Sequence, residues 1–254
     1  MKTITICQRK GGNGKSTSCL NLAQCLSLKG KRVLIIDLDD QKNSSGSVPV
    51  TEEIHHTVED VVTDERIGVR ESVVKTSWEG VSLLAGSAHL SGAIKELDGE
   101  VGSHLVLKEK LEREAEQYDI CLIDTSPSLN ILVVNALCAS EYVFIPLSSK
   151  YFSLQGLGQT IESIQKVQKR LNQTLRILGI AFVIYDGRSS LSKEVVSKAG
   201  EEYTPYMCRS VINQNVRVEE AQVMQMSIID YKESDRGAVQ YKALCEELLQ
   251  RMEA

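Results

Sequence analysis

A glycine-rich segment containing two lysines is the part of this sequence best suited to chemistry. Residues 10–17 read Lys-Gly-Gly-Asn-Gly-Lys-Ser-Thr and follow an apolar run at 3–7. Glycines let backbone N–H groups converge on a phosphate, and a following helix directs its positive end at the same point. Lys15 would supply charge to the β- and γ-phosphates, Ser16 an oxygen to Mg²⁺, and Thr17 a contact to the α-phosphate. The segment predicts a phosphate-binding loop.

Carboxylates follow two further apolar runs. Asp37 and Asp39 come after residues 33–36, and Asp124 comes directly after residues 120–123. Ligands of a doubly wound sheet bind at the carboxyl ends of its strands. We therefore expect Asp124 to hold Mg²⁺, directly or through water, opposite Ser16. The alternative is that these acids only form turns or cap helices.

Strand-like and helix-like segments alternate along the chain. This alternation predicts an α/β fold with a doubly wound, mostly parallel sheet and helices on both faces. Strands are expected at residues 3–7, 33–37, 81–85, 120–124, 142–145 and 177–184. Helices are expected at residues 17–28, 103–117, 129–138, 154–171, 191–201 and 237–252. Residues 40–80 are the least regular part, and no composition break divides the chain, so one domain is expected over residues 1–254.

Composition excludes several classes of protein. Hydrophobic residues make up 42% of the 254 residues, too many for a disordered chain, and no apolar window is long enough to span a membrane. A net charge of −5 argues against a protein coated in positive potential. The seven cysteines are scattered without metal-ligand spacing, as expected for small core residues in a reducing cytoplasm.

The loop at residues 10–17 departs from the usual phosphate-binding loop because Arg9 replaces its first glycine and Lys10 adds a second lysine. In this form it resembles the signature of the deviant Walker A ATPases, a group that includes ParA-type partition ATPases, MinD and the nitrogenase iron protein. Residues 143–147 and 151–157 resemble ParA more closely than the other two. The chain is thus similar to a P-loop NTPase of the ParA type over nearly its whole length.

The resemblance implies a Mg²⁺-dependent ATPase that forms a homodimer around ATP and turns over slowly without a partner. Lys10 would reach the phosphates of the other subunit, and Asp39 would position the attacking water with support from Asp37. Lys10, Lys15 and Asp39 are then the catalytic residues, and Ser16 and Asp124 the metal ligands. The full nucleotide-binding set is Lys10, Gly11, Gly12, Asn13, Gly14, Lys15, Ser16, Thr17, Asp37, Asp39, Asp124 and Asn213.

The resemblance also implies binding to non-specific DNA. Residues 185–195 and 215–221 are similar to two late ParA segments that carry DNA-binding arginines, which match Arg188 and Arg217 here. Lys193, Lys198 and Arg209 would assist. Residues 186–217 hold five basic and four acidic side chains, so a purely structural role for the two arginines stays open. The first strand starts too early for an amino-terminal helix-turn-helix, so sequence-specific binding is not expected.

The expected partners are therefore a second copy, DNA and a ParB-like or cargo adaptor protein, at a cytoplasmic, nucleoid-associated location. A MinD-like membrane-associated ATPase is the main alternative, but its basic amphipathic tail is replaced here by the acidic residues 246–254. An iron–sulfur reductase is less favoured because Cys121 and Cys138 lack the expected local context. The GTPase motifs of the signal-recognition class are absent, which favours ATP.

Overall fold

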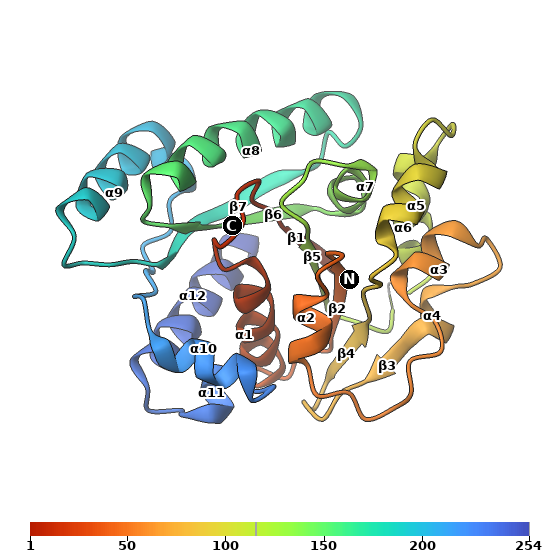
Figure 1. Cartoon of the computed structure of the whole chain (residues 1–254), viewed down its shortest axis with the longest axis horizontal. Coiled ribbons are helices and arrows are strands. Elements are labelled where there is room, and N and C mark those ends of the chain that lie inside the picture. The colour runs from red at the N-terminus through yellow and green to blue at the C-terminus, as the bar shows by residue number, and fades with distance from the viewer. Residues whose placement is uncertain (115, 254) are drawn as a thin grey trace.

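A computed structural model describes residues 1–114 and 116–253, and the strands of these residues form one sheet (Figure 1). Its seven strands lie in the order β3-β4-β2-β5-β1-β6-β7, and every neighbouring pair is parallel except β3 with β4. This confirms the predicted α/β class. The strands are β1 Lys2–Ile6, β2 Val33–Leu38, β3 Val73–Lys75, β4 Val81–Leu84, β5 Ile120–Thr125, β6 Tyr142–Ser148 and β7 Arg176–Ile184.

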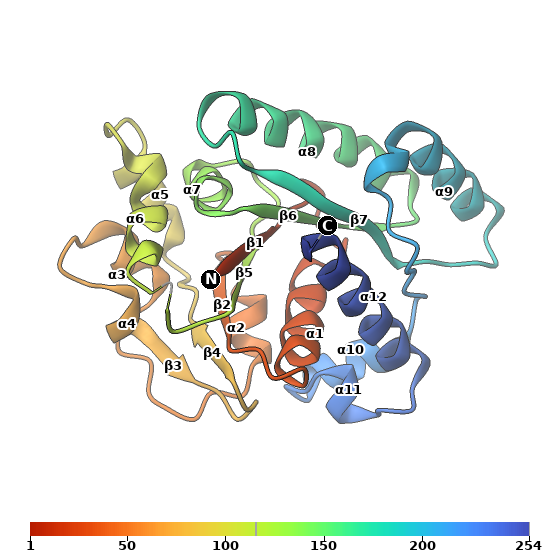
Figure 2. The same ribbon diagram turned by 180° about the vertical axis from the view of Figure 1, so that it is seen from behind.

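Helices cover both faces of the sheet (Figures 1 and 2). Strand β2 shows why: Val33 and Ile35 point into one apolar cluster, whereas Leu34 and Ile36 point into the cluster on the other face. The α-helices are α1 Lys15–Ser27, α2 Asn43–Ser47, α3 Val58–Thr63, α4 Val69–Ser72, α5 Leu90–Leu97, α6 Val106–Glu112, α7 Ile131–Ala139, α8 Tyr151–Arg170, α9 Ser190–Tyr203, α10 Val216–Val223, α11 Ile228–Tyr231 and α12 Arg236–Glu253.

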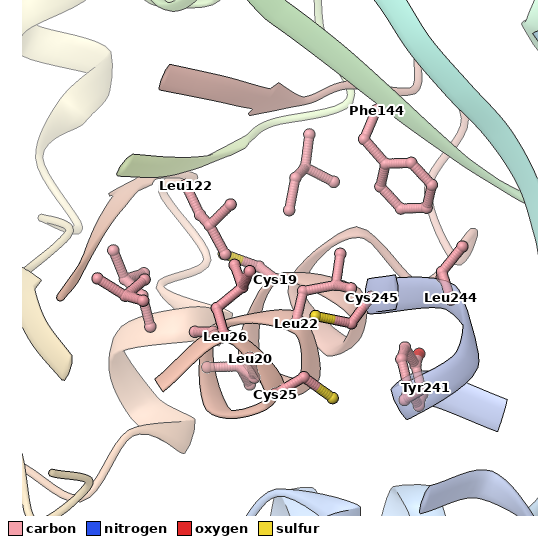
Figure 3. Packing of buried hydrophobic residues seen from close by; sticks show 14 of the residues in the cluster. Cys19, Leu20, Leu22, Cys25, Leu26, Leu122, Phe144, Tyr241, Leu244 and Cys245 are labelled. Atoms are coloured by element: carbon pink, nitrogen blue, oxygen red, sulfur yellow. The ribbon is translucent and has the colours of Figure 1, made fainter. Parts of the chain in front are cut away.

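One face of the sheet is covered by α1 and α12, which pack against each other. Figure 3 shows Leu22 and Cys25 of α1 near Leu244 and Cys245 of α12, beneath Phe144 of the sheet. All seven cysteines are buried and free, as expected for core residues. No helix in the described part of the chain is both long enough and apolar enough to cross a membrane.

The structure corrects several predicted elements. The irregular region at residues 40–80 contains α2, α3, α4 and the antiparallel strand β3, none of which was predicted. The predicted helix at 103–117 is a 3₁₀ turn, Ser103–Leu105, followed by α6, which ends at Glu112; position 115 of that prediction lies outside the described residues. Helix α8 begins three residues earlier than predicted, at Tyr151.

Candidate functional site

The glycine-rich loop joins β1 to α1 at the carboxyl edge of the sheet. Asn13, which is buried, holds it in place: its Nδ2 donates to the Lys10 carbonyl at 2.9 Å, and its Oδ1 accepts from the Ser148 N–H at 2.9 Å. The sequence predicted Asn13 as a nucleotide contact. Its side chain ties the loop to β6, and a contact between its backbone N–H and a phosphate stays a prediction.

Glycine is required at position 14, immediately before α1. Its φ of 73° lies in the left-handed region, and a Cβ there would come within 2.9 Å of Val183 Cγ2. Gly12 has the same φ of 73°, but a Cβ on it would meet nothing within 4 Å. The loop therefore needs glycine twice, once for conformation alone and once for both conformation and space.

The loop forms one wall of a cleft of about 280 Å³. Lys15 lies in this cleft and is buried, with only 7% of its surface exposed. Asp39, which is 4% exposed, also lines it, and its Oδ1 accepts from the Gln41 N–H at 3.0 Å. The lining residues are Gly11, Gly12, Asn13, Gly14, Lys15, Ser16, Thr17, Asp39, Gln41, Asn43, Pro127 and Gln222.

Lys10 does not belong to that lining. Its side chain is exposed, and its Nζ lies 5.8 Å from the centre of the Phe152 ring, within range of a cation–π interaction. No carboxylate in the described ranges forms an ion pair with it. The second lysine of the loop is thus directed outward, away from the cleft of its own chain.

Asp37 and Asp124 occupy neighbouring positions on β2 and β5, and both are fully buried. Both carboxylate oxygens of Asp37 accept hydrogen bonds: Oδ1 accepts from the Asp39 N–H, and Oδ2 accepts from the N–H and hydroxyl of Ser45 at 2.8 and 2.7 Å. The role of Asp37 in the structure is therefore to hold the start of α2 and the backbone of Asp39.

Asp124 is only partly satisfied. Its Oδ2 accepts from the Ser44 hydroxyl at 2.7 Å, but its buried Oδ1 has no hydrogen-bond partner. Burial, with a further contribution from Asp37, raises the pKa of Asp124 to about 7, although Ser16, Ser44 and Lys15 oppose the rise. Ser16 faces this carboxyl without completing a hydrogen bond to Oδ1.

An unpartnered buried carboxylate oxygen costs free energy unless something binds it. A carboxylate beside a serine hydroxyl is the kind of oxygen donor set that Mg²⁺ takes when a phosphate and water supply its other ligands. No cluster of three or more His, Cys, Asp or Glu side chains suited to a metal occurs in the described chain. The residues present therefore fit Mg²⁺ that arrives with a phosphate, and the roles of Ser16 and Asp124 as its ligands stay predictions.

A smaller hollow of about 90 Å³ adjoins the cleft and shares Gly14 and Thr17 with it. Asn213 lines this hollow, and its backbone N–H donates to Gln240 Oε1 at 3.0 Å. The structure thus brings Asn213 to the loop from the far end of the chain. The other lining residues are Val183, Ile184, Ile212, Gln214, Asn215, Val218, Glu219 and Tyr241.

Four residues that line the main cleft were not predicted as site residues from the sequence: Gln41, Asn43, Pro127 and Gln222. Gln222 of α10 accepts a hydrogen bond from the Thr17 hydroxyl at 2.9 Å. The two residues are separated by 205 positions, and the ParA-like segment at residues 215–221 ends just before the glutamine. No signal in the sequence alone indicated it.

The predicted DNA-binding residues lie on different elements: Lys193 and Lys198 on α9, Arg217 on α10, and Arg188 and Arg209 in the segments between helices and strands. Arg188 has 93% of its side chain exposed, with Asp186 at 3.3 Å, whereas Arg217 pairs at 2.9 Å with Asp235, whose side chain is only 6% exposed. Lys198 forms an ion pair with Glu194 on α9. Lys193 lies exposed on the same helix, nearer Arg188 along the chain.

Arg209 belongs to a different part of the surface. It lies in the segment between Met207 and Asn213. Met207 forms an isolated parallel β-bridge with Ile180 of β7, and Asn213 forms another with Tyr185, just after the end of β7. Its backbone N–H donates to Glu247 of α12 at 2.8 Å. The side chain is exposed.

Known proteins resemble the chain in both sequence and structure. The family described as AAA domain matches residues 1–177. Sporulation initiation inhibitor protein Soj of Bacillus subtilis is 35% identical over 248 residues, covering 97% of this chain and 98% of that protein. Chromosome partitioning protein ParA of Caulobacter vibrioides is 35% identical over 254 residues, covering 99% and 95%. The chain belongs to the ParA/Soj family.

Solved structures share the fold of the chain. Cobyrinic acid a,c-diamide synthase from Mycobacterium smegmatis, with bound ADP and magnesium, superimposes with a TM-score of 0.85 at 26% identity, covering 100% of this chain and 96% of that one. An ATP complex of a McdA variant from Cyanothece has a TM-score of 0.86 at 22% identity, covering 98% and 96%, and shows the fold alone. The P-loop NTPase fold and the ParA-type resemblance are both confirmed.

Proposed function

We propose that this ParA/Soj-family chain is a Mg²⁺-dependent ATPase that positions DNA or another large cargo. The observation that carries this proposal is the unpartnered Oδ1 of buried Asp124, which lies beside Ser16 and close to Lys15 at the glycine-rich loop. Mg²⁺ bound there with ATP would neutralise charge on the phosphates. Ser16 and Asp124 would hold it, and Asp39 in the same cleft would orient the attacking water.

The second hollow supports a nucleotide rather than a simple phosphate as the ligand. Because it shares Gly14 and Thr17 with the main cleft, one molecule can place its phosphates in the cleft and its base in the hollow beside Asn213. The Mycobacterium smegmatis protein, which shares this fold, has bound ADP and magnesium, and this supports a nucleotide as the ligand. We propose ATP as the substrate.

We further propose that ATP closes a homodimer in which Lys10 of each subunit reaches the phosphates of the other. The outward direction of Lys10 supports this, because the side chain lies outside its own cleft and has no acidic partner in the described residues. The dimer would bind non-specific DNA through Arg188 and its neighbours. A ParB-like partner would then stimulate the otherwise slow hydrolysis of ATP. The similarity of the chain to Soj and to the chromosome partitioning protein ParA supports this proposed cycle.

The packing of α12 argues against the membrane-associated alternative. Tyr241, Leu244, Cys245 and Leu248 form its apolar face, and all four are buried in the core with α1. This face is therefore not available to lipid. We propose that the protein is cytoplasmic and nucleoid-associated, and that its residues 1–254 act as one domain. In a flotation assay with anionic liposomes and Mg·ATP, the protein should stay in the unbound fraction.

The direct test of the proposed activity is phosphate release from ATP. Wild-type protein should hydrolyse ATP with Mg²⁺ and stop when EDTA is added, and Lys15→Ala and Asp39→Ala should each lower the rate by at least about tenfold. Val101→Ala, at a fully exposed side chain outside the cleft lining, serves as a control for folding and handling. Hydrolysis that continues unchanged in EDTA or in Lys15→Ala would refute the proposal.

A further inference from the structure

Helix α10 brings a carboxamide into the phosphate cleft. Gln222 lines that cleft with Lys15 and Ser16, and its Oε1 accepts from the Thr17 hydroxyl at 2.9 Å. Thr17 belongs to the first turn of α1, directly after the glycine-rich loop. The glutamine therefore lies where the phosphate chain of a nucleotide would pass.

The other end of this carboxamide is available to a ligand. A glutamine side chain carries two N–H donors on Nε2, and within the described residues no hydrogen bond uses Nε2 of Gln222. The cleft lining includes Lys15, whose ammonium is a donor, and the loop glycines, which can offer backbone N–H groups; Asp39 is the one acidic residue among the described lining residues. The free N–H donors of Gln222 add to the donors of this lining, and together they favour binding of an anionic oxygen.

Two contacts just after the glutamine in the chain hold the end of its helix beside α1 and α2. Gln225 Nε2 donates to the Gly46 carbonyl of α2 at 3.0 Å. The Ile228 N–H donates to Asn21 Oδ1 of α1 at 2.8 Å, and α10 and α11 lie beside α1 in both views (Figures 1 and 2). Gln222 is thus held in place before any ligand arrives, which lowers the ordering cost of using it.

We propose that Gln222 is a nucleotide-binding residue: its Nε2 donates to a phosphate oxygen of the bound nucleotide while its Oε1 orients the Thr17 hydroxyl. This inference rests on the proposed nucleotide-binding function and adds to it a residue outside the loop. Because α10 also carries Arg217, the same contact links occupancy of the cleft to the helix that presents this arginine. Nucleotide binding should therefore reduce the mobility of α10.

Two substitutions separate a ligand contact from a structural one. Gln222→Glu keeps an oxygen that accepts from Thr17 but replaces the donors with negative charge, whereas Gln222→Ala removes both groups. In titrations with fluorescent MANT-ADP and Mg²⁺, Gln222→Ala should raise Kd by about tenfold, and Gln222→Glu should raise it further. Val223→Ala, at an 83% exposed neighbour, is the matched control and should bind like wild type.

Hydrogen–deuterium exchange gives a second measurement. Mg·ADP should slow exchange of the residues 216–223 amides in wild type and Val223→Ala but not in Gln222→Ala. Thermal unfolding without nucleotide should be nearly the same for all four proteins, since Gln222 is only half-buried. A Gln222→Glu protein that binds MANT-ADP as tightly as wild type would overturn the inference.

The outcome for Lys15→Ala shows which proposal has failed. If wild type binds MANT-ADP, Lys15→Ala does not, and Gln222→Glu binds normally, then only the role of Gln222 is wrong. If wild type itself does not bind, or Lys15→Ala binds as well as wild type, then the proposed nucleotide site fails and the role of Gln222 fails with it.

Discussion

Asp37 and Asp124 lie side by side on β2 and β5, fully buried, yet only Asp37 has hydrogen bonds to both of its carboxylate oxygens. The difference assigns them different tasks. Asp37 supports the polypeptide around Asp39 and Ser45, whereas Asp124 keeps one oxygen for a ligand. Two carboxyls so close together in the core also make the ligand-free site sensitive to pH.

Ligand-free protein should lose stability as pH rises. Burial raises the folded-state pKa of Asp124 to about 7, whereas an unfolded aspartate titrates near 3.9, so the folded state binds more protons between these values. The contribution of Asp124 to the free energy of unfolding is fully present below about pH 4 and is lost as the pH rises through about 7. Urea unfolding in EDTA at pH 5.5 and pH 8.0 should show Asp124→Asn gaining stability relative to wild type at the higher pH. An equal difference at both pH values would contradict this assignment.

The two loop glycines should respond differently to alanine. Gly12→Ala places a Cβ on a residue in the left-handed region, which lowers the free energy of unfolding by about 1 kcal/mol. Gly14→Ala has the same effect and in addition places its Cβ 2.9 Å from Val183 Cγ2. We expect Gly14→Ala to lower the urea midpoint more and to abolish MANT-ADP binding. Adding Val183→Ala should restore part of the loss, measured as a double-mutant cycle. Equal losses for Gly12→Ala and Gly14→Ala would show that the clash with Val183 is unimportant.

DNA binding should depend more on Arg188 than on Arg217. Arg188 is 93% exposed, but Arg217 must share its charge with Asp235 at 2.9 Å. In fluorescence anisotropy with Mg·ATP, Arg188→Ala should weaken binding and lower the slope of log K against log salt by about 0.9 for each phosphate that the arginine neutralises. Lys169→Ala on α8 is the charge-matched control. A larger effect for Arg217→Ala, or none for Arg188→Ala, would refute this ranking.

The sequence predicted those parts of the molecule whose signal is local. The loop at residues 10–17 and the apolar runs that become β1, β2 and β5 each carry their pattern within a few residues, so the positions of Lys15, Asp39 and Asp124 followed from strand ends meeting at one edge. Helices α2 and α4, with five and four residues, are too short to show a helical period.

The remaining features depend on contacts between distant residues. Gln222 meets Thr17 across 205 positions, and Arg217 meets Asp235 only because α10 packs beside the start of α12. Asn13 sits inside the recognised motif, yet its side chain bonds to Ser148, which no loop pattern indicates. Such pairings follow from the packed fold and not from residue type or spacing.

The mass of the particle in solution tests the proposed ATP-bridged dimer most directly. Asp39→Ala, which should bind ATP without hydrolysing it, is measured by light scattering after gel filtration with Mg·ATP, with Mg·ADP and without nucleotide. We expect twice the mass of one chain with Mg·ATP only, and a single-chain mass for the Lys10→Ala, Asp39→Ala double variant under every condition. A single-chain mass for Asp39→Ala in saturating Mg·ATP would contradict the dimer and the function built on it.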